Sequence, residues 1–112
     1  MKLSKILEQL PTKELTNYKD IDIVDAYTSD LLSDVIANSK ENQLWITLHG
    51  HQNVVAVALL KDLAGIVITG GYKPDSSMLD KAKSENVAVF TTELKSFEFS
   101  GKLYQLLNEN EA

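Results

Sequence analysis

The chain has 112 residues, of which 44% are hydrophobic and 24% charged, and its formal net charge is −5. This length suits one compact domain, and a chain so rich in apolar residues is not a disordered tail. It has no cysteine and no arginine, which excludes disulfides and thiolate chemistry and argues against nucleic acid or an anionic membrane as a partner.

The first predicted element is a short amphipathic helix over residues 2–10, which ends before Pro11. Its apolar residues share one helix face and do not form the unbroken run of a signal peptide. No apolar run in the chain approaches the roughly 20 residues that span a bilayer, so we expect a cytoplasmic protein. Residues 12–20 are mostly polar and are predicted to form a short edge strand and a turn.

From residue 21 onward a unit of strand, turn and helix recurs four times. The predicted strands cover residues 21–26, 44–48, 65–69 and 86–90. The turns that follow them cover residues 27–30, 49–53, 69–74 and 91–93. The first predicted helix is indicated by an apolar stripe over residues 31–36, and the second covers residues 54–63 with Asn53 as its cap. The third starts near Pro74, and the last covers residues 93–107.

The gaps between these strands are long enough for helical crossovers, whereas a hairpin needs only a few residues. The strands read as continuous apolar runs, which is typical of strands covered on both faces. The sequence therefore predicts a three-layer α/β fold, in which helices flank a mostly parallel sheet of four to five strands. Residues 1–112 are expected to form a single domain.

Ligands of open parallel sheets bind outside the carboxyl ends of the strands. Three of the four helices there begin with an acid, and we predict that Asp30, Asp75 and Glu93 cap their own helices. The turn over residues 49–53 has no acid, so its helix N-terminus is the predicted anion site. The candidate ligand-binding residues come from this turn and the next one; they are His49, Gly50, His51, Asn53, Thr69, Gly70, Gly71 and Lys73.

In this hypothesis the paired glycines let backbone N–H groups approach the ligand, and Lys73 supplies a positive charge. Because a histidine gains charge as the pH falls through about 6.5, binding should tighten toward acid. In the structural alternative, Gly70 and Gly71 only turn the chain and Lys73 is solvated. A metal held by His49 and His51 is a weaker alternative, because the chain has no third His and no Cys.

No catalytic residue is predicted, because no nucleophile elbow and no phosphate-binding P-loop is present. We expect no metal and no cofactor. A homodimer is predicted, because the helix over residues 54–63 is apolar on nearly every side and a single sheet cannot cover all of that surface. The last helix also carries apolar residues on several faces, namely Leu94, Phe97, Phe99, Leu103, Tyr104 and Leu107.

The chain resembles the DRTGG domain family over about residues 3–107. The resemblance rests on AYTSDLLS at 26–33, on WIT followed by NVVAVA at 45–58 and on TGGYKPD at 69–75. It implies a regulatory domain like those beside CBS domains in some inorganic pyrophosphatases and before the catalytic part of long phosphotransacetylases. The N-terminal domain of HPr kinase/phosphorylase is similar. The family is named after an Asp-Arg-Thr-Gly-Gly motif. This chain keeps the last three residues of the motif as Thr69, Gly70 and Gly71, and has Val67 and Ile68 where Asp and Arg would stand.

Three functions remain open at this point. The first is a non-catalytic regulatory or ligand-sensing module that binds a nucleotide or another small anion at the carboxyl edge of the sheet. The second is a protein-interaction subunit that modulates a separately encoded enzyme. The third is a small enzyme that acts on a phosphorylated metabolite, with His49 or His51 as general acid or base.

Overall fold

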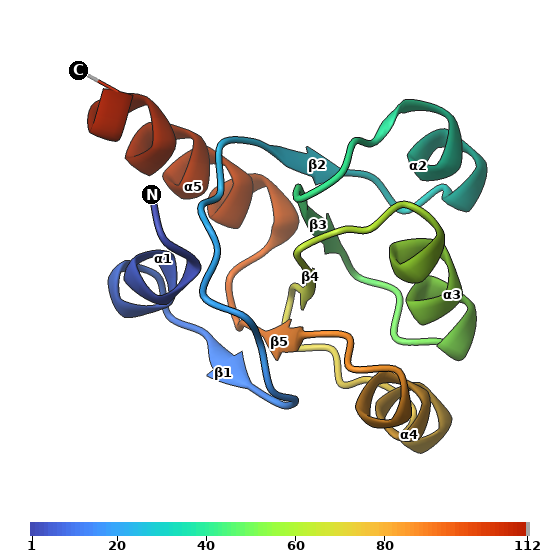
Figure 1. The fold of residues 1–112 in the computed structure, drawn as a ribbon. Helices are drawn as coiled ribbons and strands as arrows, with labels where there is room; N and C mark the ends of the chain where they lie inside the picture. Colours follow the sequence, from blue (N-terminus) through green and yellow to red (C-terminus); the bar gives the residue numbers. More distant parts are fainter. Residues whose placement is uncertain (112) are drawn as a thin grey trace.

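A five-stranded sheet lies between two layers of helices (Figure 1). The structure is a computed structural model that describes residues 1–111, with side chains through Glu109. Its helices are α1 (Leu3–Gln9), α2 (Leu32–Asn38), α3 (Gln52–Leu60), α4 (Ser76–Ser84) and α5 (Ser96–Glu111). Its strands are β1 (Lys13–Glu14), β2 (Ala26–Thr28), β3 (Leu44–Thr47), β4 (Gly65–Ile68) and β5 (Val89–Thr91).

The strands are ordered β1-β5-β4-β3-β2 across the sheet. β2, β3, β4 and β5 run parallel, and β1 pairs antiparallel with β5 at one edge. The predicted three-layer, mostly parallel fold is confirmed, and so is the short edge strand in residues 12–20. Because all four parallel strands point the same way, the turns that follow them gather at one edge, which we call the carboxyl edge.

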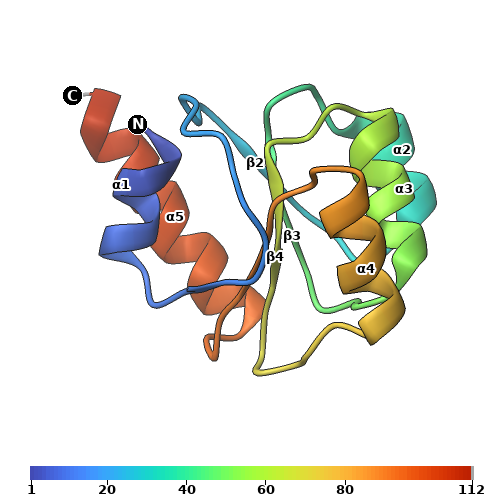
Figure 2. The same cartoon turned by 60° about the horizontal axis from the view of Figure 1, so that its bottom comes forward.

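The helices divide between the two faces of the sheet (Figure 2). α1 and α5 cover one face, where their apolar residues pack on Leu44, Ile46 and Phe90. α2, α3 and α4 cover the other face, where Trp45 and Ile66 are buried. Alternate residues of β3, β4 and β5 therefore enter opposite cores, which explains why these strands are apolar throughout. No helix within residues 1–111 has the length and apolar character needed to cross a membrane.

The strand predicted over residues 21–26 is misplaced. β2 begins only at Ala26 and continues through residues predicted as a turn. The β-branched run before it pairs with the start of α1 instead: the Leu3 N–H donates to the Ile21 carbonyl at 3.0 Å, and the Ile23 N–H donates to the Met1 carbonyl at 2.8 Å. Ile23 is fully buried in this pairing, as it would be in the central sheet. The apolar pattern of residues 21–26 is therefore the same whether the segment pairs with the start of α1 or with the sheet.

Most of the apolar surface of α3 is covered by other elements of the same chain. α3 lies between α2 and α4 and above the sheet, so that it has neighbours on three sides. Val54, Val55, Val57 and Ala58 are buried there, while Leu59 and Leu60 reach the surface. The composition of this helix therefore does not by itself require a second subunit.

One surface interaction near α2 makes stability depend on pH. Asp34 accepts hydrogen bonds from the Tyr27 hydroxyl at 2.7 Å and from the Asn38 amide at 2.8 Å. These bonds, the one from Tyr27 first, hold the pKa of Asp34 below its ordinary value of 3.8. A depressed folded pKa adds stability above the unfolded value, and this stability is lost as the pH falls through the folded pKa.

We therefore expect Asp34→Asn to lower the melting temperature at neutral pH, and this deficit should shrink as the pH falls below 3.8 and the wild-type carboxyl becomes protonated. Thermal melts across this range measure the difference. Asp80→Asn, which changes another exposed helical aspartate, is the matched control. An Asp34→Asn protein that loses as much stability in acid as at neutral pH contradicts the assignment.

Candidate functional site

The turns over residues 49–53 and 69–74 lie side by side at the carboxyl edge, as predicted. The Asp75 N–H donates to the Gly50 carbonyl at 2.8 Å, and the His51 Nδ1 lies 2.8 Å from the Asp75 Oδ2. The turns are in direct contact. A Cβ atom on Gly50 would lie 2.7 Å from the Pro74 Cα and 3.1 Å from the Lys73 carbonyl oxygen. Backbone thus fills the place where a crevice between these turns was expected.

The acids at this edge do not cap their helices, contrary to prediction. Asp30 accepts bonds from the Thr47 hydroxyl at 2.7 Å and the Leu48 N–H at 3.0 Å, and so ties α2 to the end of β3. Asp75 occupies the N-cap position of α4 but makes no side-chain cap bond. Glu93 lies before α5, and its carboxylate is beside Gly71. The Asp30 and Asp75 carboxylates instead make side-chain contacts to neighbouring segments.

The predicted anion site at the start of α3 is therefore not free of negative charge. The Asp75 carboxylate reaches it from the neighbouring turn through its contact with His51. The rings of His49 and His51 lie on the same side, with centroids 6.1 Å apart. His51 itself stands at the N-cap position, so Asn53 lies in the first turn of α3 and is not its cap. Among the described residues no group of three or more His, Cys, Asp or Glu side chains could hold a metal ion.

The two glycines after β4 build a turn. Both have φ +74°, a left-handed conformation that glycine adopts most readily. Their N–H groups are already bonded: Gly70 donates to the Leu94 carbonyl at 2.7 Å, and Gly71 donates to the Thr92 carbonyl at 3.0 Å. Thr69 is buried, and its hydroxyl lies 2.6 Å from that of Ser96 at the start of α5. These contacts support the structural alternative for Thr69 and both glycines.

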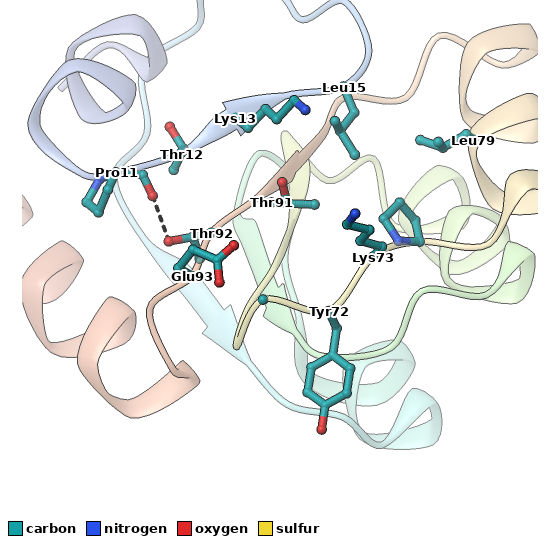
Figure 3. Close-up of a pocket in the computed structure, with 12 residues that line it drawn as sticks. Pro11, Thr12, Lys13, Leu15, Tyr72, Lys73, Leu79, Thr91, Thr92 and Glu93 are labelled. Carbon is teal, nitrogen blue, oxygen red and sulfur yellow. Dashed lines mark hydrogen bonds between the residues drawn. The ribbon is translucent and has the colours of Figure 1, made fainter.

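A pocket does open at the carboxyl edge, on the other side of the 69–74 turn. It has a volume of about 550 Å³ and lies between this turn, the end of β5 and the edge strand β1 (Figure 3). This volume falls within the usual range of small-molecule sites. The lining residues are Pro11, Thr12, Lys13, Leu15, Gly71, Tyr72, Lys73, Pro74, Leu79, Thr91, Thr92 and Glu93.

The pocket combines positive charge, hydroxyl groups and apolar surface. Lys13 on β1 and Lys73 on the 69–74 turn supply two ammonium groups, and Glu93 supplies one carboxylate. Leu15 and Leu79 contribute apolar side chains beside Thr91 (Figure 3). Two cations against one anion, next to hydroxyl donors, suit a ligand that is negative at one end and apolar at the other.

Thr92 shapes the pocket wall rather than facing a ligand. Its hydroxyl donates to the Pro11 carbonyl at 2.6 Å and accepts from the Leu94 N–H at 3.2 Å. The same dashed contact to Pro11 is visible in Figure 3, where the Tyr72 ring extends away from the other side chains. The wall between β1 and β5 is therefore held by side-chain bonds.

Of the eight predicted ligand residues, the structure places Gly71 and Lys73 in this pocket. Its other charged members, Lys13 and Glu93, were missed as ligand residues. Lys13 lies opposite Thr91 because β1 pairs with β5. The edge strand in residues 12–20 was the available signal, but nothing local showed which strand it would join.

The chain matches a protein-family model and is similar to solved structures. A protein-family comparison matches residues 14–106 to the DRTGG domain. Among solved structures, the fold is similar to the CBS and DRTGG domains of the regulatory region of Clostridium perfringens pyrophosphatase, complexed with the activator diadenosine tetraphosphate. The TM-score is 0.68 at 21% sequence identity, over 88% of this chain and 44% of that one, so this chain spans less than half of its neighbour. A search of curated proteins finds no match.

Proposed function

Because this chain belongs to the DRTGG domain family, we propose that it is a non-catalytic regulatory module of the cytoplasm that senses a small anion. The ligand class is a nucleotide or another phosphate-bearing metabolite. The site is the pocket between β1, the 69–74 turn and the end of β5.

The observation that carries this proposal is the pairing of Lys13 with Lys73 around one pocket of about 550 Å³. A phosphate group takes charge-assisted hydrogen bonds from ammonium groups and further bonds from hydroxyls such as that of Thr91. The apolar side chains of Leu15 and Leu79 offer a surface for a base or another flat apolar group.

The structural neighbour supports the ligand class at a coarser level. Its regulatory region is complexed with diadenosine tetraphosphate, which contains both phosphates and bases. That region has CBS domains in addition to a DRTGG domain. Its ligand therefore suggests the chemical class of a ligand for this chain, but it does not indicate where on the domain a ligand binds. A nucleotide panel is therefore the rational first screen.

The test is a thermal-shift screen with AMP, ADP, ATP, diadenosine tetraphosphate and inorganic phosphate. A ligand that binds the folded state raises the melting temperature as its concentration rises. We expect at least one nucleotide to do so, with a smaller shift for Lys13→Ala at the same ligand concentration. A panel without any shift contradicts ligand sensing and favours the protein-interaction subunit, whereas breakdown of the nucleotide during incubation would favour the small enzyme.

A further inference from the structure

The outer face of α5 carries two large aromatic side chains that nothing in the described part of the chain covers. Phe97 is 91% exposed and Tyr104 is 72% exposed. The opposite face of the same helix is fully used, because Phe99, Leu103 and Leu107 are buried against the sheet. α5 is thus apolar on two faces, and among the described residues only one of these faces is packed against the rest of the chain.

Phe97, Gly101 and Tyr104 are spaced i, i+4 and i+7, so they form one stripe along the helix. We call these three residues the α5 stripe. Gly101 lies at its middle, where a Cβ atom would meet nothing within 4 Å. Glycine is unfavourable inside a helix, and here no close neighbour within the chain requires it. A glycine between two exposed aromatic residues permits close approach by another helix.

From this geometry we infer that the α5 stripe is the contact surface for a second copy of this chain. The two α5 helices pack antiparallel about a two-fold axis that passes near Gly101. Residues at equal distances before and after Gly101 then face each other. Phe97 meets the partner's Tyr104, and the same contact is repeated on the other side of the axis.

The charges beside the stripe favour this arrangement over others. Glu98, Lys102 and Glu109 are exposed on one flank of α5. Antiparallel packing brings Glu98 within about two residues of the partner's Lys102, or roughly 3 Å along the helix. In a parallel pair the two-fold axis runs along the helices, so the charged flanks of the two copies lie on opposite sides of the interface and Glu98 cannot reach the partner's Lys102.

The size of the surface suits a modest but specific interface. A typical stable interface buries about 800 Å² on each partner. Phe97 and Tyr104 can each contribute on the order of 150 to 250 Å² when fully covered, so the two aromatics supply a substantial part of this area. Neither Glu98 nor Lys102 takes part in an ion pair within the described part of the chain.

Light scattering at about 100 µM provides the first test. We expect a particle of twice the chain mass of 12.4 kDa. Phe97→Asp should return it to the monomer without loss of helicity, because this side chain makes little contact with its own domain. Leu60→Asp is the matched control on α3, where Leu60 is 67% exposed. A monomeric wild type overturns the inference, and so does dissociation by Leu60→Asp but not by Phe97→Asp.

Charge exchange and cross-linking test the antiparallel geometry. Glu98→Lys or Lys102→Glu alone should weaken the dimer about tenfold, and the two changes combined should restore it. Because the chain has no cysteine, Gly101→Cys introduces a single thiol near the proposed axis. We expect it to form a disulfide-linked dimer much faster than Lys83→Cys on α4. Equal rates, or a double charge variant weaker than both single variants, would exclude the antiparallel pair.

Discussion

Replacement of both pocket lysines by alanine should weaken nucleotide binding about a hundredfold, and Lys13→Ala alone about tenfold. A charge-assisted hydrogen bond contributes on the order of 1.5 to 3 kcal/mol, and solvent exposure places these lysines near the lower end of that range. A tenfold change in affinity corresponds to about 1.4 kcal/mol. Titration calorimetry with the nucleotide that gives the largest melting shift measures the effect.

The control variants distinguish the pocket from the histidine turn. Lys83→Ala removes a charge from exposed α4 and should leave affinity unchanged, as should His49→Ala. Because no histidine lines the pocket, wild type and His49→Ala should have the same affinity at every pH between about 6 and 8, whatever the ionisation of the ligand's own phosphate contributes. A ligand that binds more tightly in acid and loses affinity on His49→Ala would return the site to the 49–53 turn.

Gly50→Ala should reduce the free energy of unfolding by about 1 to 3 kcal/mol, the usual cost of inserting a group into a packed site. The added Cβ would lie 2.7 Å from the Pro74 Cα, which is backbone and cannot rotate away. Relief of the clash requires the 49–53 turn to separate from the 73–75 segment. Separation weakens the bond from the Asp75 N–H to the Gly50 carbonyl. Urea denaturation followed by circular dichroism measures the change.

Gly101→Ala is the matched control for this substitution, because its Cβ would meet no atom within 4 Å of the same chain. Alanine is preferred over glycine inside a helix, so the monomer should gain up to about 1 kcal/mol. Both variants are compared at low protein concentration, where any dimer dissociates. If Gly50→Ala is as stable as wild type, the two turns are not rigidly packed.

The α/β architecture could be predicted from the sequence because each feature behind it is local. Apolar runs such as residues 44–47 and 65–68 end at polar turns, and a helical stripe follows each of them. Gaps of this length permit only crossovers, so parallel pairing follows without knowledge of any contact. The family resemblance is likewise carried by contiguous segments, and it is confirmed over residues 14–106.

The site depended on contacts between segments far apart in the chain. Asp75 was predicted to cap α4, but its carboxylate lies against His51, 24 residues earlier. Gly70 was expected to offer its N–H to a ligand, but the Leu94 carbonyl takes it. Each prediction identified the correct chemical capacity of a residue and assigned it the wrong partner. Donors and acceptors at a turn form hydrogen bonds with whichever partner the fold brings closest.

The sequence by itself determined the order of the elements, the two buried faces of the sheet and the edge at which polar turns collect. Periodicity and chain length are sufficient for these features, since they depend on neighbours along the chain. Only the tertiary structure decided that β1 returns antiparallel beside β5 and brings Lys13 to the same pocket as Lys73. The pairing of an edge strand depends on which side of the sheet remains open once the crossovers have formed. This is a property of the assembled sheet, and no short segment encodes it.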